Sequence, residues 1–162
     1  MKAIVAVDKN WGIGCNGNLL TYIPNDLKYF KRMTKNNVVV MGRKTLESLP
    51  GSKPLALREN IVITRDINYS IENCVIFNDI LTAVEEIVKI KDKDVFIIGG
   101  ESIYKQFLPF VTECYVTKID KEFDADTYFP NLEDLDWKLV EKSEKQFYNN
   151  IGYTWCKYVR IK

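Results

Sequence analysis

The carboxylate of Asp26 is the side chain in this sequence best placed to do chemistry. Residues 24–34 have the apolar spacing of a helix that opens at a proline and turns Leu27, Phe30 and Met33 inward. Phe30 and Met33 follow Asp26 by four and seven positions, so the carboxylate projects toward the apolar side of the helix. It is either a first-turn acid stabilised by the helix dipole, the commoner arrangement, or a carboxylate at the rim of a pocket, placed to pair with a cationic or amidine-like ligand group.

Glycine-containing turns form a second group of candidates. Residues 95–98 are an unbroken apolar run, and Gly99 and Gly100 follow directly before a segment with helical spacing. Without Cβ atoms this backbone can approach a ligand closely, and the amides that start the helix favour phosphate, although a tight turn without a ligand explains the two glycines slightly better. Residues 42–45 and Arg65 add cations after two further apolar runs. A bound phosphate and a solvated basic turn account for these cations equally well.

The composition excludes several classes of protein. The chain has no histidine, which excludes Ser-His-Asp and Cys-His catalysis and His-ligated metals, and we expect no metal site. The formal net charge is +1 without a long basic run, which argues against nucleic acid or an anionic membrane as a partner. No apolar run reaches transmembrane length, and Met1-Lys2 leads directly into an apolar strand rather than a signal peptide. The cysteines predict free thiols in a reducing compartment, the cytoplasm; they are Cys15, Cys74, Cys114 and Cys156.

The elements that must position these groups alternate between strand and helix. The expected strands are 3–7, 38–41, 60–64, 75–77, 95–98, 113–119, 137–140, 146–148 and 153–161. Helices are expected over 24–34, 43–49 and 101–108, and after Asn78 or Asp79 with Ile80, Val84, Ile87 and Val88 inward. Residues 8–20, 50–59 and 120–130 are expected loops, and 8–20 is long enough to be either a lid or a flexible connection.

This order predicts an α/β fold in a single domain over residues 1–162. The central sheet is expected to be mostly parallel and flanked by helices, with an antiparallel hairpin at the C-terminus. Ligands of such sheets bind at the carboxyl ends of the strands. Glycines, cations and hydroxyls follow several of the expected strands, and this convergence favours a nucleotide cofactor.

Eight short motifs follow one another along the chain. They are residues 4–6 (IVA), 12–14 (GIG), 23–31 (IPNDLKYFK), 40–48 (VMGRKTLES), 58–62 (RENIV), 97–104 (IIGGESIY), 115–117 (YVT) and 126–130 (DTYFP). Each motif is modest alone, but the ordered set covers nearly the whole chain and is highly specific. The sequence therefore resembles a bacterial dihydrofolate reductase. The resemblance implies a monomeric, cytoplasmic enzyme that uses NADPH to reduce 7,8-dihydrofolate to 5,6,7,8-tetrahydrofolate, with hydride transfer to C6 and protonation at N5. It also implies that the enzyme is an antifolate target that binds antifolate inhibitors.

The resemblance also implies roles for individual residues. Asp26 is expected to bind N3 and the 2-amino group of the pterin, supported by Thr117, and Arg58 to bind the carboxylate of the glutamate tail. The expected walls of the substrate pocket are Ile4, Val5, Ala6, Leu27, Phe30, Leu49, Leu55, Ile98 and Tyr104. The expected NADPH contacts are Ala6, Ile13, Gly14, Gly42, Arg43, Lys44, Thr45, Thr64, Arg65, Ile98, Gly99, Gly100, Glu101, Ser102, Ile103 and Tyr104. The loop 8–20 is expected to close over the nicotinamide with Leu19 at its working edge, and the Gly99–Gly100 bond is expected to be cis.

One position departs from the family pattern. The family usually carries tryptophan two residues after the position of Leu19, where it helps to order a water near the catalytic acid; this sequence has Thr21 there. A threonine hydroxyl can also hold a water, so Thr21 joins Asp26 and Leu19 as a candidate catalytic residue. Two other functions stay open: a riboflavin-pathway pyrimidine reductase, which would not need Asp26 together with Arg58, and a non-catalytic nucleotide-binding module, which would not need a carboxylate in an apolar face.

Overall fold

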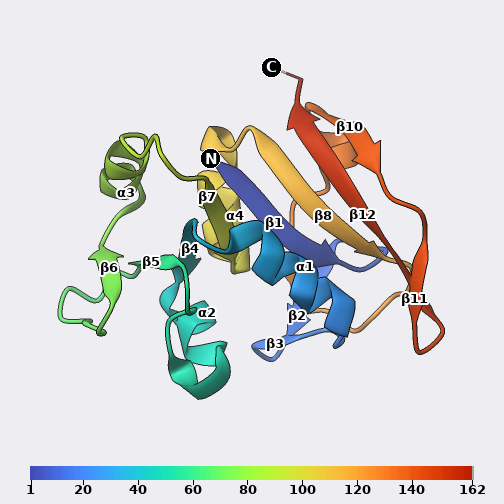
Figure 1. Cartoon of the computed structure of the whole chain (residues 1–162), viewed down its shortest axis with the longest axis horizontal. Coiled ribbons are helices and arrows are strands. Elements are labelled where there is room, and N and C mark those ends of the chain that lie inside the picture. The colour runs from blue at the N-terminus through green and yellow to red at the C-terminus, as the bar shows by residue number, and fades with distance from the viewer. Residues whose placement is uncertain (162) are drawn as a thin grey trace.

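The main sheet brings together strands from both ends of the chain (Figure 1). The computed structural model describes residues 1–161. The strands of this sheet are β1 (Lys2–Val7), β4 (Val38–Gly42), β5 (Glu59–Ile63), β6 (Cys74–Phe77), β7 (Val95–Gly99), β8 (Glu113–Ile119), β10 (Trp137–Lys142), β11 (Gln146–Tyr148) and β12 (Ile151–Arg160). Their order is β10-β12-β8-β1-β7-β4-β5-β6, with β11 paired to β12.

Strand direction follows the residue pattern. From β8 to β6 every pairing is parallel, and β12 runs antiparallel to β8, β10 and β11. In the centre, Val38, Val39, Val40 and Met41 are each 0% exposed, because a parallel strand covered on both faces has no solvent side. The final hairpin turns at Asn149 and Asn150, which both have positive φ, a conformation that asparagine tolerates well. The predicted sheet and hairpin are confirmed.

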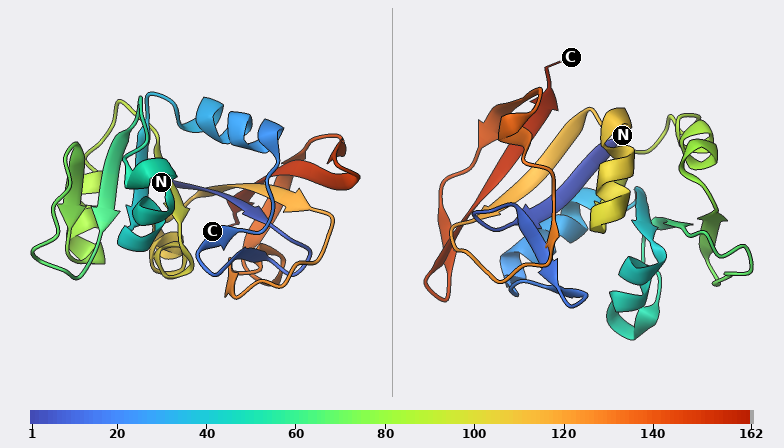
Figure 2. Two further views of the ribbon diagram at one scale, coloured as in Figure 1. Left: turned by 90° about the horizontal axis from the view of Figure 1, so that it is seen from below. Right: turned by 180° about the vertical axis from the view of Figure 1, so that it is seen from behind.

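Helices cover both faces of the sheet (Figure 2). They are α1 (Pro24–Thr34), α2 (Arg43–Ser48), α3 (Ile80–Ile87) and α4 (Glu101–Phe107), with short 3₁₀ turns at η1 (Pro50–Ser52), η2 (Leu108–Phe110) and η3 (Leu132–Asp134). The larger apolar core joins α3 and α4 to one face, and a smaller cluster joins Leu46 of α2 to the other face. α1 lies on the face of the sheet away from α4 (Figure 2), and its first turn lies over β1 and β8.

Residues 8–20 are more ordered than a loop. They contain β2 (Gly12–Cys15) and β3 (Asn18–Leu19), and β2 also pairs with β9 (Thr127–Tyr128), which lies inside the other predicted loop, 120–130. The prediction of two loops without strands was therefore wrong. Asn16-Gly17 at the hairpin turn, with φ of 51° and 78°, is a strong hairpin signal that the sequence analysis did not use.

Two predicted inward side chains face solvent instead. Val88 is 51% exposed, because α3 ends at Ile87 and the buried Ala83 takes the inward position beside Val84. Leu27 is 40% exposed, because it lies at the opening of a cavity and not in the core. Among residues 1–161, no helix is both long and apolar enough to span a membrane.

Candidate active site

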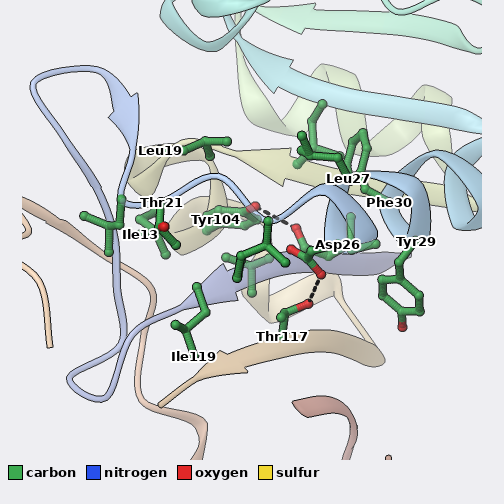
Figure 3. A pocket seen from close by; sticks show the side chains of 16 residues that line it. Ile13, Leu19, Thr21, Asp26, Leu27, Tyr29, Phe30, Tyr104, Thr117 and Ile119 are labelled. Atoms are coloured by element: carbon green, nitrogen blue, oxygen red, sulfur yellow. Dashed lines mark hydrogen bonds between the residues drawn. The ribbon is translucent and has the colours of Figure 1, made fainter. Parts of the chain in front are cut away.

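A cavity of about 150 Å³ lies between α1 and the face of β1 and β8 that α1 covers (Figure 3). The predicted site residues that line it are Ile4, Val5, Ala6, Ile13, Leu19, Thr21, Asp26, Leu27, Phe30, Ile98, Tyr104 and Thr117. The lining residues that were not predicted are Leu20, Ile23, Tyr29 and Ile119. Asp26 carries the one charged side chain among these described lining residues. The tertiary structure thus gathers most of the predicted substrate residues around one carboxylate.

Asp26 is held by hydrogen bonds from the sheet. It lies in the first turn of α1, which starts at Pro24 without a side-chain cap. Thr117 Oγ1 on β8 donates a hydrogen bond of 2.6 Å to Asp26 Oδ1 (Figure 3). Burial among apolar side chains raises the pKa of Asp26 above its ordinary value, and the hydrogen bonds from Thr117 and Trp155 oppose that rise. The carboxyl can therefore take up a proton more readily than a surface acid.

Trp155 is a contact of Asp26 that the sequence analysis missed. Its indole Nε1 on β12 donates to Asp26 Oδ1 at 3.0 Å, although the two residues lie at opposite ends of the chain. Its ring stacks on Tyr29 of α1, with centroids 4.5 Å apart and planes 12° apart. The alternation of β12 assigns Trp155 to one face of the strand, but only the strand order shows that this face meets α1.

Tyr104 joins the pocket to the glycine turn. Its hydroxyl donates to the backbone carbonyl of Ile4 at 2.7 Å, and its side chain is buried. Gly99 has a φ of 122°, and a Cβ there would approach the Tyr104 ring to 3.2 Å, so a side chain at position 99 would strain the backbone and push the ring aside. The Gly99–Gly100 bond is cis, as the resemblance implied.

The carboxyl ends of β4 and β7 meet where the cofactor was expected. A Cβ on Gly42 would lie 3.1 Å from Ile103, and a Cβ on Gly100 would lie 3.6 Å from Thr45 Oγ1. The two turns are therefore packed against each other through bare backbone. Neither α2 nor α4 has a side-chain cap, so the first amides of both helices are not used by a capping side chain. This open backbone, flanked by cations, fits the phosphates of a dinucleotide.

Several predicted cofactor residues have protein partners. Arg43 pairs with Glu47 at 3.1 Å on the exposed side of α2, and Glu101 accepts a hydrogen bond from the backbone N–H of Tyr128 on β9 at 2.8 Å. Ile103 is buried against Gly42, so only its backbone can reach a ligand. Arg65 and Lys44 are exposed. The structure brings the turns together but leaves each of these contacts a prediction.

Three predicted substrate residues lie outside the cavity lining. Leu49 and Leu55 pack on the smaller apolar cluster. Arg58 donates from Nη1 to Thr34 Oγ1 at 3.1 Å and from Nε to the Ala56 carbonyl at 2.8 Å, which places its guanidinium at the C-terminal end of α1. The buried Asn60 holds Leu55 and Arg58 in place, because its side chain hydrogen-bonds to the backbone of both residues.

The residues expected to form the lid have a firm anchor at one end. Asp8 is 2% exposed; its carboxylate accepts hydrogen bonds from the backbone N–H groups of Asn10 and Gly12 at 2.8 Å and of Phe123 at 3.0 Å. At the other end Leu19 is 65% exposed and still borders the cavity. Thr21 lines the cavity, and among residues 1–161 the hydrogen bonds to the Asp26 carboxylate come from Thr117 and Trp155.

Comparison with known proteins gives the same family for the whole chain. The family model described as dihydrofolate reductase matches residues 1–160. The chain belongs to the dihydrofolate reductase family. It is 40% identical to a dihydrofolate reductase of Staphylococcus haemolyticus, over 100% of this chain and 96% of that protein. It is 34% identical to a dihydrofolate reductase of Bacillus subtilis (strain 168), over 96% of this chain and 91% of that protein.

A solved structure has the same fold. The dihydrofolate reductase of Enterococcus faecalis, complexed with NADP(H) and RAB-propyl, superimposes with a TM-score of 0.88 at 30% identity, over 99% of this chain and 96% of that one. Family membership confirms the predicted fold class, the predicted reductase activity on dihydrofolate and NADPH as the cofactor. Family membership also confirms that the protein binds a small-molecule substrate and inhibitors. The pyrimidine reductase and the non-catalytic module are set aside.

Proposed function

We propose that Asp26 is the proton-bearing group of an NADPH-dependent dihydrofolate reductase and that the cavity under α1 binds the pterin. The observation that carries this proposal is the carboxylate itself, which is buried among apolar side chains and held on Oδ1 by Thr117. Asp26 binds the pterin edge at N3 and the 2-amino group, and it supplies the proton that N5 requires, directly or through a water that it orders.

The apolar walls have a separate task. Ile4, Ala6 and Ile98 on the sheet face Leu27 and Phe30 on α1 across the cavity. These walls enclose the pterin and exclude water from the reacting carbon. By excluding water they also keep the Asp26 carboxyl protonated more often than a solvated acid.

NADPH fits the turns after β4 and β7. When bound, it supplies the hydride that reaches C6. Residues 42–45 and 99–104 would hold the cofactor through open backbone, and Arg43, Lys44 and Arg65 would supply positive charge for the extra phosphate that distinguishes NADPH from NADH. Leu19 and Thr21 border the same cavity and close the nicotinamide end.

Arg58 receives the carboxylate of the glutamate tail. Thr34 Oγ1 donates a hydrogen bond to the backbone carbonyl of Phe30, and the same Thr34 Oγ1 accepts a hydrogen bond from Arg58 Nη1. Arg58 therefore lies about one helical turn beyond the pocket residue Phe30, in the direction of a tail that leaves the pocket along α1. Leu49 and Leu55, which pack on the smaller apolar cluster, would contact the benzoyl group.

The direct test is to follow the NADPH absorbance band of the purified protein with and without 7,8-dihydrofolate. We expect oxidation of NADPH only when dihydrofolate is present, and inhibition by a diaminopyrimidine antifolate. NADPH binding without turnover would refute the catalytic role proposed for the cavity. Turnover that survives unchanged in Asp26→Asn would refute the role assigned to that carboxylate.

We also propose that residues 1–162 form one domain that acts as a monomer in the cytoplasm. The cysteines Cys15, Cys74, Cys114 and Cys156 are free thiols, as expected in a reducing compartment. Sedimentation equilibrium over a range of concentrations tests the monomer, and cell fractionation tests the location.

A further inference from the structure

Both protein donors to Asp26 use the same oxygen. Thr117 Oγ1 donates to Oδ1 at 2.6 Å and Trp155 Nε1 donates to Oδ1 at 3.0 Å. Oδ2 has no hydrogen-bond partner among residues 1–161. The carboxylate is therefore asymmetric, with one oxygen bound to the protein and one left for a ligand.

The register of the sheet produces this arrangement. Trp155 of β12 and Thr117 of β8 are direct partners in the antiparallel pair. Residues directly opposite each other on neighbouring strands project to the same face, so a single register sets both donors under the first turn of α1. A shift of one residue would turn Trp155 to the other face of the sheet and remove its hydrogen bond to Asp26.

The indole of Trp155 is held from two sides. Tyr29 stacks on it at 4.5 Å between centroids, and Tyr153 meets it edge-on at 6.0 Å and 62°. Tyr29 follows Asp26 by three positions on α1, so the two side chains share a face of that helix. Helix α1 thus carries both Asp26 and Tyr29, the ring that orients the indole donating to Asp26.

We propose that Trp155 is a positioning residue for the reaction: together with Thr117 it fixes Asp26 Oδ1, so that Oδ2 faces the ligand and is the oxygen that carries the proton. This inference rests on the proposed function of Asp26. An oxygen that already accepts two hydrogen bonds has both lone pairs in use, and a proton therefore binds the other oxygen. Trp155 acts through Asp26 and contacts no reacting atom.

The other titratable side chains that line the cavity with Asp26 are the tyrosines Tyr29 and Tyr104. Burial and the charge of Asp26 raise the pKa of Tyr29, and burial raises the pKa of Tyr104. The groups on the outer side of the Tyr29–Trp155 stack are Arg32, Tyr115, Glu141, Lys142, Cys156 and Lys157. These groups are the same in every variant below, so a difference in titration between variants belongs to Asp26.

The first test is the pH dependence of turnover in Trp155→Phe. Phenylalanine keeps a ring against Tyr29 and removes the N–H donor. Losing a donor to the carboxylate raises the pKa of Asp26, so the alkaline fall in kcat/KM should move to higher pH by about one unit, equivalent to ~1.4 kcal/mol. Trp137→Phe on β10 makes the same chemical change away from the cavity, and it should leave the alkaline fall in kcat/KM at the wild-type pH. The proposal would be overturned if the alkaline fall in kcat/KM stayed at the wild-type pH in Trp155→Phe while kcat was lowered equally at every pH.

The second test needs no turnover. In the ¹⁵N-labelled wild-type protein, the indole N–H signal of Trp155, identified by its loss in Trp155→Phe, should titrate with pH as Asp26 ionises. Asp26→Asn should abolish this titration. A Trp155 signal that does not titrate would overturn the hydrogen bond and the proposal with it. A titrating signal in a protein without dihydrofolate turnover would refute the proposed function while supporting the Trp155–Asp26 pair.

Discussion

Replacement of Asp26 by asparagine removes charge and proton while preserving shape. Thr117 and Trp155 both donate to Oδ1, so the amide oxygen must take that place and the amide nitrogen must face the cavity. The variant then presents a donor to the pterin N3–H and 2-amino group, which are themselves donors. One charge-assisted hydrogen bond contributes ~1.5–3 kcal/mol, or roughly 10- to 150-fold at ~1.4 kcal/mol per factor of ten. Losing the proton donor costs roughly 10²–10⁴-fold in the chemical step.

We therefore expect kcat/KM of Asp26→Asn for dihydrofolate to fall by at least about 10²-fold at neutral pH. Steady-state oxidation of NADPH measures this loss, and it should shrink at low pH, where substrate arrives already protonated. NADPH affinity, measured by fluorescence titration, should stay near wild type because the cofactor turns lie outside the altered contact. Thr117→Val is the matched variant: it keeps the carboxylate, removes one donor to Oδ1 and should lose less. Full activity of Asp26→Asn at neutral pH would refute the assignment of Asp26 as the proton-bearing group.

Three further predictions concern cofactor, tail and stability. Replacing both Arg43 and Arg65 by alanine should narrow the preference for NADPH over NADH by tens-fold or more, since each charge-assisted contact is worth ~1.5–3 kcal/mol. An unchanged ratio of the kcat/KM values for the two cofactors would place the 2′-phosphate elsewhere. Arg58→Lys should raise KM for dihydrofolate and leave a tail-less pterin nearly unaffected, because lysine cannot bind a carboxylate bidentately; equal losses on both substrates would indicate a structural role. Because burial raises the folded-state pKa of Asp26, wild type loses stability as pH rises from the unfolded value of ~3.9 through the folded one. Asp26→Asn should therefore melt at a higher temperature than wild type above this range and not below it, and calorimetry at acidic and neutral pH measures the difference.

Patterns of neighbouring residues were enough to predict most of the elements. The helix from Pro24 to Thr34 and the strand from Glu113 to Ile119 have the predicted bounds, because periodicity and proline are local signals. The absence of histidine excludes several mechanisms without any structure. The direction of Asp26 toward the apolar side was also predictable, since it depends only on helical spacing.

The order and register of the strands determine which side chains donate hydrogen bonds to Asp26. Thr117 was assigned to the network through the resemblance alone, and Trp155 was not assigned at all, because a bond between residues 26 and 155 has no local signal. Only the placement of β12 beside β8, with Trp155 opposite Thr117, brings the indole under α1. The small sheet of β2, β3 and β9 was missed for the same reason: β2 and β9 belong to segments that look like loops, and each becomes a strand only when it pairs with the other.

The sequence by itself therefore determined the α/β class, the strand-end glycines and the single acid on an apolar helix face. The tertiary structure decided which oxygen of that acid is bound and which is free. The physical reason is that side-chain direction along a helix or strand is periodic and local, whereas a hydrogen bond across the sheet depends on register. Register is set by the packing of the whole core, to which residues from every part of the chain contribute.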